Sequence, residues 1–202
     1  MTEPADRDRP DREPSDREYW NRRYSEGSWP DAPSPWLEQN VDLLGEPGCA
    51  LDVAGGTGRN ALWLAQRGWD VTIIDVSDVA LAMAKARAET LDVPLRTHLA
   101  DLSVEAVPEG RWDLILIFHY LDKILLSDFA AVLKPTGLLI GVLATVTNLE
   151  RNERPSRRHL IGNGELPGLL GSLKLLRYEE GWQDDHHDAR FVARREDAVH
   201  VG

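Results

Sequence analysis

The sequence has little cysteine and no long apolar run, and each absence excludes a class of protein. Its single cysteine, Cys49, cannot form an internal disulfide, which favours a reducing compartment. No window approaches the about 18 consecutive apolar residues of a membrane span, and the polar start does not resemble a secretory signal. We therefore expect a cytoplasmic protein without a membrane partner.

Basic residues are also scarce, since 23 lysines and arginines stand against 34 aspartates and glutamates, for a formal net charge of −11. Such a surface repels phosphate backbones, so the composition predicts no nucleic-acid partner. Apolar residues, in contrast, make up an ordinary 42% of the chain, and the length of 202 residues suits one α/β domain with a real core. No internal repeat is visible, and nothing in the sequence indicates an oligomeric state.

The two ends of the chain differ in composition from the rest. Residues 1–18 contain seven acids, four arginines and three prolines, so they bury too little apolar surface to offset the entropy of ordering and are predicted to be a disordered tail. The aromatic residues of "EYWNRRY" then recur at helical spacing, and 25–36 is a predicted loop rich in proline and serine. The sequence thus predicts one domain over 19–195 and a frayed end at 196–202.

Between the ends, apolar runs alternate with helical patterns. This succession predicts parallel strands joined by right-handed helical crossovers. After a short helix at 164–171, strand candidates at 172–182 and 186–195 follow each other so closely that they must pair antiparallel. The predicted fold class is α/β, a Rossmann-like, doubly wound, seven-stranded, mostly parallel sheet with a C-terminal antiparallel hairpin, in three layers. The other expected strands are 50–54, 70–75, 95–99, 112–119 and 137–145, and the other expected helices are 59–67, 76–90 and 122–133.

A glycine-rich turn, "LDVAGGTGRN", stands where the first strand ends and a helix begins. Gly55, Gly56 and Gly58 permit unusual backbone angles and let a ligand approach the chain closely, while the free N–H groups of the following helix attract a polar or negative group. Nineteen residues after Gly56, Asp75 ends the second strand, where its carboxylate can accept two hydrogen bonds from the hydroxyls of a ribose. Together these features predict a cofactor that contains adenosine.

The turn alone does not say which such cofactor is bound. "GTGRNA" also fits the G-x-G-x-x-G/A pattern of nicotinamide-dinucleotide enzymes, so an NAD(P)-dependent oxidoreductase is one alternative. Asp52, however, lies inside the strand before the turn, where a carboxylate can bind an ammonium group but repels a pyrophosphate. The expected hairpin is unusual for a dinucleotide fold, and no stretch of the chain remains for a separate substrate domain. These features favour an adenosine-containing cofactor with an ammonium group over a dinucleotide.

The motifs resemble those of class I S-adenosylmethionine-dependent methyltransferases over roughly 19–195. "LDVAGGTG" is similar to the hydrophobic-acid-x-G-x-G-x-G motif of that family, "VTIIDVS" to its second motif with the ribose-binding acid, and "LKPTGLLI" to the element that leads into the fifth strand. Within the class, "WNRRY", "GGTGRNALWLAQRGWDV" and "FHYL" resemble bacterial small-molecule methyltransferases of the tellurite-resistance and thiopurine type. One departure is Ala54, which stands at the first glycine position of the motif.

The resemblance implies roles for the motif positions in binding S-adenosylmethionine. Asp52 would orient the methionine amino group, Arg59 would pair with the methionine carboxylate, and Asp75 would bind the ribose hydroxyls. Asp101 would accept a hydrogen bond from the exocyclic amine of the adenine. The other implied contacts are Ala54, Gly55, Gly56 and Gly58 in the turn, Val76 and Leu102 at the adenine, Phe118 near the sulfonium, and Trp20, Arg23 and Tyr24 as a cover, although simple packing of an N-terminal helix is the alternative for Trp20 and Tyr24.

Residues that act on the methyl acceptor are expected after the fourth and fifth strands, because ligands of doubly wound sheets bind beyond the carboxyl ends of the strands. "FHYLDK" places His119 and Tyr120 there as catalytic candidates. His119 can accept a proton from an attacking hydroxyl or amine, and a purely structural histidine is the alternative. The N/D-P-P-Y/F element of amino-directed DNA and protein methyltransferases is absent from this position, which argues against a nucleic-acid or glutamine substrate.

A basic cluster lies in the segment 146–162, which we interpret as a substrate lid. In a chain of negative net charge, this cluster favours an anionic small-molecule acceptor. A solvated loop, partly neutralised by Glu150 and Glu153, explains the cluster equally well. The substrate-binding candidates are Arg151, Arg157, Arg158 and His159.

The motif "DDHHD" at 184–188 has the composition of a metal site, but adjacent histidines in an extended turn point to opposite faces and chelate one ion poorly. We therefore expect no metal. The sequence as a whole favours a methyltransferase that transfers a methyl group to a small molecule by in-line displacement. The alternatives are the oxidoreductase named above and a non-catalytic regulatory protein that binds S-adenosylmethionine.

Overall fold

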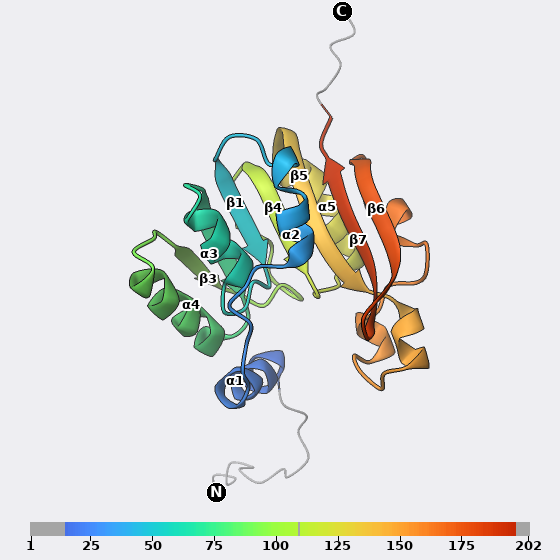
Figure 1. The fold of residues 1–202 in the computed structure, drawn as a ribbon, viewed down its shortest axis with the longest axis horizontal. Coiled ribbons are helices and arrows are strands. Elements are labelled where there is room, and N and C mark those ends of the chain that lie inside the picture. Colours follow the sequence, from blue (N-terminus) through green and yellow to red (C-terminus); the bar gives the residue numbers. More distant parts are fainter. Residues whose placement is uncertain (1–14, 109, 197–202) are drawn as a thin grey trace, which may run out of the picture.

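The computed structural model describes residues 15–196 except residue 109. Its strands are β1 (Cys49–Val53), β2 (Asp70–Asp75), β3 (Arg96–Leu99), β4 (Trp112–Phe118), β5 (Leu133–Ala144), β6 (Lys174–Gln183) and β7 (His186–Arg194). They form one sheet in the order β3-β2-β1-β4-β5-β7-β6 (Figure 1). The first five strands are parallel, and β7 pairs antiparallel with both β5 and β6. The predicted fold class, including the terminal hairpin, is confirmed.

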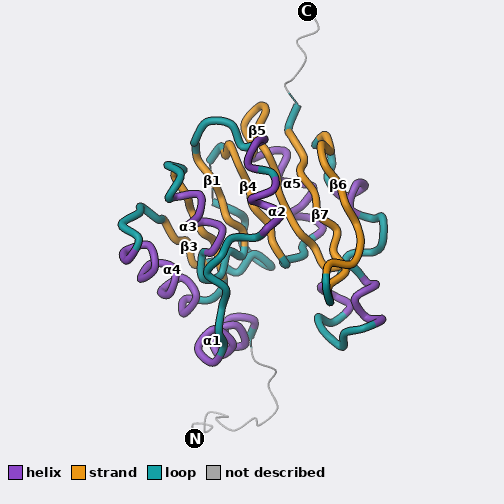
Figure 2. Tube along the Cα trace, viewed as in Figure 1, coloured by secondary structure: helices purple, strands orange, loops and turns teal. Residues whose placement is uncertain are grey.

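Helices cover both faces of this sheet, as Figure 2 shows. The helices are α1 (Asp16–Glu26), α2 (Pro35–Gln39), α3 (Arg59–Ala65), α4 (Asp78–Thr90), α5 (Lys123–Val132) and α6 (Leu166–Leu169), with short 3-10 helices η1 (Val41–Leu43), η2 (Val146–Glu150) and η3 (Arg157–His159). Side chains of α2, α3 and α4 pack into one apolar core, and those of α5 and α6 into another. The molecule therefore has the expected three layers.

The central strands are apolar along their length because both of their faces are buried. In β4, Leu114 and Leu116 belong to one core, while Ile115 and Ile117 belong to the other, and all four side chains are fully buried. Burying each such side chain contributes on the order of 2 kcal/mol. The period of two along the strand thus sends alternate residues to opposite helical layers.

Helix α2 was not predicted; it begins at Pro35, inside the stretch 25–36 that was expected to be a loop, and continues to Gln39. It has five residues and begins with Pro35 at its first turn, so it is too short to show a helical period. Its Trp36 and Leu37 are nevertheless buried, and Trp36 Nε1 donates a 3.1 Å hydrogen bond to the carbonyl of Phe191 on β7. Tertiary packing, rather than local pattern, forms this helix.

The chain becomes helical earlier than the predicted tail allows, since α1 begins at Asp16. Ser15 and Glu18 form a capping box, in which the Glu18 N–H donates to Ser15 Oγ and the Ser15 N–H donates to the Glu18 carboxylate. This S-x-x-E signature was present in the sequence but was outweighed by the acidic composition around it. The rest of the predicted tail, 1–14, lies outside the described residues. So does the predicted frayed end, except for residue 196.

The segment 146–162 is less irregular than expected of a lid, because it holds η2 and η3. Asn148 is fully buried and fixes the start of the segment to β7, donating a 2.5 Å hydrogen bond to the His187 carbonyl and accepting one of 3.1 Å from the His187 N–H. In the part of the chain that the structure describes, no helix is both long and apolar enough to cross a membrane.

Candidate functional site

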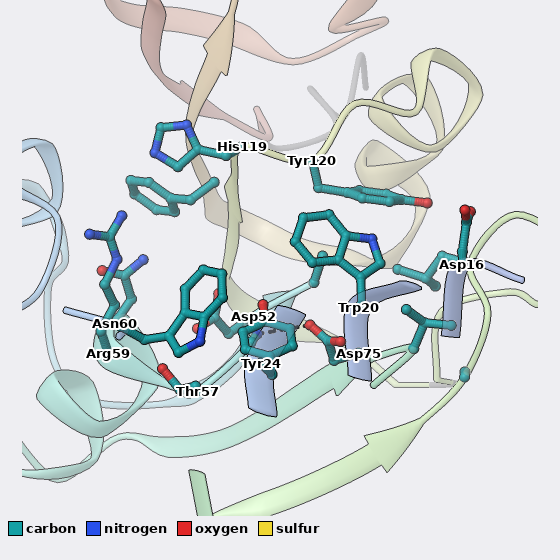
Figure 3. Close-up of a pocket in the computed structure, with 18 of the residues that line it drawn as sticks. Asp16, Trp20, Tyr24, Asp52, Thr57, Arg59, Asn60, Asp75, His119 and Tyr120 are labelled. Atoms are coloured by element: carbon teal, nitrogen blue, oxygen red, sulfur yellow. Dashed lines mark hydrogen bonds between the residues drawn. The ribbon is translucent and has the colours of Figure 1, made fainter. Parts of the chain in front are cut away.

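A cavity of about 360 Å³ opens at the carboxyl ends of β1, β2 and β4 (Figure 3). The strand order reverses between β1 and β4, and ligands of doubly wound sheets bind at such a switch point. The volume of the cavity lies near the lower end of the range of about 300–1,000 Å³ for small-molecule sites. The structure brings fourteen of the predicted site residues into the cavity wall: Trp20, Tyr24, Asp52, Ala54, Gly55, Gly56, Arg59, Asp75, Val76, Asp101, Leu102, Phe118, His119 and Tyr120.

The glycine turn between β1 and α3 forms part of the wall and is joined to the end of β2. Gly56 has a φ of +58° and donates its N–H to Asp75 Oδ2 at 2.8 Å. A Cβ at this position would lie 2.5 Å from the hydroxyl oxygen of Tyr24, so any other residue here would strain the backbone and displace Tyr24. Gly58 is the N-cap of α3 and does not line the cavity. Ala54 has a φ of +51°, which explains the family preference for glycine there and implies backbone strain in this chain.

Asp52 is a buried carboxylate with one oxygen that has no partner. Its side chain is 2% exposed and lines the cavity, and its Oδ2 makes no hydrogen bond. Burial raises the pKa of Asp52 to about 7, although Arg59 and the backbone N–H of Ala61 act in the opposite direction. A buried carboxylate oxygen without a donor is costly, so this position is suited to a ligand group that donates a hydrogen bond and carries positive charge.

Asp75 ends β2 beside this acid and is held by two backbone donors. Gly56 donates to its Oδ2 and Ser77 to its Oδ1, each at 2.8 Å. Burial raises the pKa of Asp75, and the hydrogen bonds from Ser77 and Gly56 oppose that shift. Each carboxylate oxygen has a second lone pair, so the group can still accept hydrogen bonds from a ligand in the cavity.

Helix α1 forms one side of the cavity. Asp16, Trp20 and Tyr24 are spaced four residues apart, so they share one face of the helix, and all three line the cavity. Figure 3 shows the Tyr24 ring between Asp52 and Asp75. Burial, together with the negative charges of these two acids, raises the pKa of the Tyr24 hydroxyl well above its usual value.

His119 follows β4 at the end of the cavity opposite Asp16. It has a left-handed backbone with a φ of +59°, and its N–H donates a 2.8 Å hydrogen bond to the carbonyl of Val142 on β5. The ring can be reached from the cavity, yet desolvation by the surrounding protein lowers its pKa, as do Arg59 and His186, while Asp188 acts in the opposite direction. A neutral imidazole in this position can accept a proton.

Tyr120 and Asp101 lie toward the other end of the cavity. Burial raises the pKa of the Tyr120 hydroxyl to about 12, with the charges of Asp122 and Asp101 adding to the shift. Asp101 follows β3, and its Oδ1 accepts hydrogen bonds from the backbone and hydroxyl of Ser103 at 3.0 and 2.6 Å. Leu102 supplies an apolar surface next to them.

Several wall residues were not indicated by the sequence. Asp16 was assigned to the tail, and Trp29 lay in the expected loop, yet the Trp29 ring packs 4.4 Å from that of Tyr24. Asn60 accepts a 2.8 Å hydrogen bond from the Ser34 N–H and so fixes the chain before α2 to the glycine turn. The sequence signal for Asp16 is its spacing of four residues from Trp20, which places both on one face of a helix. The wall residues without a prediction are Asp16, Trp29, Pro30, Thr57, Asn60, Ala100 and Ser103.

The predicted basic cluster does not line the cavity. The Arg151 guanidinium stacks 3.8 Å from the ring centre of Trp182 on β6, and Arg158 Nε lies 2.9 Å from His159 Nε2. Arg157 begins η3. Substrate binding by these residues therefore stays a prediction without support from the cavity. Arg23 is likewise absent from the wall, and its guanidinium lies 5.9 Å from the ring centres of Tyr19 and Trp20.

The "DDHHD" motif forms the turn between β6 and β7 and the start of β7. His187 Nδ1 and Thr145 Oγ1 are 2.7 Å apart, whereas Asp188 raises and His186 lowers the pKa of His119. Among residues 15–196, leaving out 109, no three or more His, Cys, Asp or Glu side chains are grouped to hold a metal ion.

Residues 50–137 match the family model described as "Methyltransferase domain". The demethylmenaquinone methyltransferase of Thermus thermophilus is 35% identical over 114 residues, which cover 54% of this chain and 49% of that protein. The ubiquinone biosynthesis O-methyltransferase of Coxiella burnetii is 28% identical over 109 residues, which cover 52% of this chain and 46% of that protein. The chain thus spans about half the length of these curated relatives.

Two solved structures extend the likeness to most of the chain. TehB from Haemophilus influenzae matches with a TM-score of 0.69 and 20% identity, covering 89% of this chain and 67% of that one. The magnesium protoporphyrin IX methyltransferase ChlM from Synechocystis, solved with bound SAH, matches with a TM-score of 0.65 and 19% identity, covering 88% and 93%. At these identities the likeness shows a shared fold.

Proposed function

We propose that the protein transfers a methyl group from S-adenosylmethionine to a small-molecule acceptor. The premise is the class I S-adenosylmethionine-dependent methyltransferase domain that this chain contains. The matched region includes the glycine turn, Asp52, Asp75 and the end of β4. Activity is inferred here because the curated relatives are about twice as long as the matched segment.

The unpartnered Oδ2 of Asp52 carries this proposal. S-adenosylmethionine has an ammonium group and a ribose separated by a sulfonium, and the cavity offers Asp52 for the first and Asp75 for the second. Because the two acids belong to the neighbouring strands β1 and β2, one ligand can reach both of them. A dinucleotide would instead place its pyrophosphate near these carboxylates, which disfavours the oxidoreductase alternative.

The residues of this chain would serve the reaction mainly by position. Bound S-adenosylmethionine supplies a methyl group activated by a positively charged sulfur, and displacement needs an acceptor aligned in a water-poor space. Phe118, Trp20 and Trp29 give the cavity apolar walls that exclude water. His119, kept neutral by its lowered pKa, takes up the proton that a hydroxyl or amine acceptor loses.

The charges in the cavity favour an acceptor that is uncharged or cationic. Four carboxylates line it, those of Asp16, Asp52, Asp75 and Asp101, whereas Arg59 is the one arginine or lysine in the described wall. The anionic acceptor expected from the basic cluster has no such support, because that cluster lies elsewhere. The two relatives are named for demethylmenaquinone and ubiquinone biosynthesis, and aromatic molecules of that kind suit the aromatic walls.

A screen with a radiolabelled methyl donor tests this function. We expect label to pass to phenols or other hydroxy-aromatic compounds in preference to carboxylates and chalcogen oxyanions, and Arg158→Ala to leave the rate unchanged. Loss of activity in Arg158→Ala, with an anionic acceptor preferred, would restore the lid interpretation. Binding of S-adenosylhomocysteine without methylation of any acceptor would support the regulatory alternative instead.

A further inference from the structure

Helix α1 supplies one wall of the cavity but is not held in place by the apolar core. None of its side chains is fully buried, although Asp16, Trp20 and Tyr24, here called the α1 wall, all line the cavity. Figure 1 shows α1 next to the end of α4, apart from the helices that cover the sheet. The position of the α1 wall therefore depends on contacts of another kind.

Those contacts are hydrogen bonds that converge on Asn21. Its Nδ2 donates to Asp78 Oδ1 at 2.7 Å, and its Oδ1 accepts from the Ser77 hydroxyl at 2.6 Å and from the Val79 N–H at 3.5 Å. Asn21 lies on the face of α1 that meets the first turn of α4, next to the face that carries the α1 wall. Both the nitrogen and the oxygen of the Asn21 side-chain amide thus form hydrogen bonds with the start of α4.

The same contacts continue to the acid at the end of β2. The Ser77 hydroxyl that donates to Asn21 also accepts a 3.1 Å hydrogen bond from the Ala80 N–H, capping α4, and the Ser77 N–H donates to Asp75 Oδ1. Asn21 therefore attaches the α1 wall to the two-residue connection that also fixes the Asp75 carboxylate.

We infer that Asn21 is a positioning residue for the cofactor cavity, seating the α1 wall on Ser77 and Asp78 so that ligand bound at Asp75 is closed over by Trp20 and Tyr24. The inference rests on the proposed function for the identity of the ligand, and S-adenosylhomocysteine serves as the probe. The α1 wall lies close to the glycine turn, since a Cβ added at Gly56 would lie 2.5 Å from the Tyr24 hydroxyl oxygen.

The neighbouring ion pair does not provide the same seat. Arg17 Nε lies 3.0 Å from Asp78 Oδ1, but the two side chains are 51% and 49% exposed, and such pairs contribute little in water. Asn21 bonds to both Ser77 and Asp78, whereas the hydrogen bond of Arg17 goes to Asp78. Arg17→Ala is therefore a matched control that removes a contact to the same carboxylate and spares the seat.

The decisive variant is Asn21→Asp, which keeps the acceptor for Ser77 but faces the Asp78 carboxylate with a like charge. The double variant Asn21→Asp with Asp78→Asn exchanges donor and acceptor, so it restores a hydrogen bond between the two positions. We expect Asn21→Asp to weaken S-adenosylhomocysteine about tenfold or more, and the double variant and Arg17→Ala to stay within about threefold of the wild type.

Trypsin gives a second readout, because Arg22 and Arg23 are cleavage sites within α1. Ligand should protect these bonds in the wild type and the double variant but not in Asn21→Asp. The unfolding temperatures of the ligand-free variants should agree within about 3 °C, since no side chain of α1 is fully buried. Equal affinity of Asn21→Asp and the wild type, or failure of the double variant to recover, overturns the inference. Failure of the wild type to bind the probe would instead refute the proposed function. In that case, faster cleavage of ligand-free Asn21→Asp than of the wild type and the double variant would still support the role of Asn21, and equal cleavage would overturn it.

Discussion

The backbone N–H of Gly56 donates a 2.8 Å hydrogen bond to Asp75 Oδ2 across nineteen positions of sequence. This contact joins the glycine turn after β1 to the end of β2, and it orients the carboxylate toward the cavity that both segments line. A Cβ at Gly56 would meet the hydroxyl of Tyr24 at 2.5 Å, so the same residue also sets how closely α1 approaches. The relative position of this turn and this acid is central to the proposed cofactor site.

The first prediction concerns Asp75. Replacing it by alanine should weaken S-adenosylhomocysteine at least about tenfold, because two hydrogen bonds from the ribose to a carboxylate are lost. Calorimetric titration measures this directly. Asp70→Ala is the control, since Asp70 is exposed at the opposite end of the same strand, and its variant should bind like the wild type. Equal affinities of the two variants would refute this placement of the ribose.

Asp52→Asn should weaken ligand binding and change how binding depends on pH. The carboxylate binds an ammonium group only when it is ionised, and its pKa is raised to about 7 by burial. Affinity of the wild type for S-adenosylhomocysteine should therefore rise between about pH 6 and pH 8, whereas the variant should lose this rise. Titrations at several pH values check the slope, and an identical slope in both proteins would contradict the role of Asp52.

The same substitution should have the opposite effect on the stability of the ligand-free protein. A pKa raised above the ordinary 3.8 means that the folded state holds the proton more tightly than the unfolded chain does. This contribution is fully present below about pH 4 and is lost as the pH rises through 7. Asp52→Asn should thus melt about 4 °C or more above the wild type at pH 8, and close to it at pH 4.5. A gain of the same size at both pH values would show that ionisation of Asp52 is not responsible.

Gly56→Ala should weaken ligand binding strongly, although the substitution adds only one methyl group. The residue has a φ of +58°, and the added Cβ would collide with the Tyr24 hydroxyl. We expect a loss of affinity of about a hundredfold and a fall in the free energy of unfolding of about 1–3 kcal/mol. Gly168→Ala, at a position where the added Cβ meets no atom within 4 Å, is the matched control and should change neither.

His119→Gln should impair methyl transfer without affecting cofactor affinity. Desolvation and nearby Arg59 lower the pKa of His119, so the imidazole is neutral at pH 7 and can accept a proton. With a hydroxyl acceptor, kcat/KM of the wild type should be level above pH 7 and fall as the pH drops through the pKa of His119. The variant should lose about a hundredfold in rate and no longer show this fall. Retention of the wild-type profile would mean that another group takes the proton.

Much of the cofactor end of the site was predictable from the sequence because it depends on strand ends. A strand followed by a glycine turn, and an acid at the end of the next strand, must meet at one edge of a parallel sheet, which places Asp52, Gly56 and Asp75 together. Strand starts were harder to predict. β5 begins at Leu133 rather than at residue 137, because Leu133 already pairs with Trp112 on β4, and a shift in register then carries the pairing past a stretch that suggested a turn.

What the sequence did not predict depends on how distant segments fold back. Trp29 and Asp16 reach the cavity only because α1 and the chain after it lie over the carboxyl edge of the sheet, and no local period encodes that path. The basic residues of 146–162 were predicted to bind substrate but do not line the cavity, and charge composition does not reveal which way a side chain points. Arg151 stacks on Trp182 instead of entering the cavity.

The central claim is that the paired acids of β1 and β2 form a site for S-adenosylmethionine. Its most direct test is calorimetric titration of the wild-type protein with S-adenosylhomocysteine and, separately, with NADH. The account predicts saturable binding of one S-adenosylhomocysteine per chain and no heat of binding with NADH. Binding of NADH in place of S-adenosylhomocysteine, or binding of neither, would contradict it.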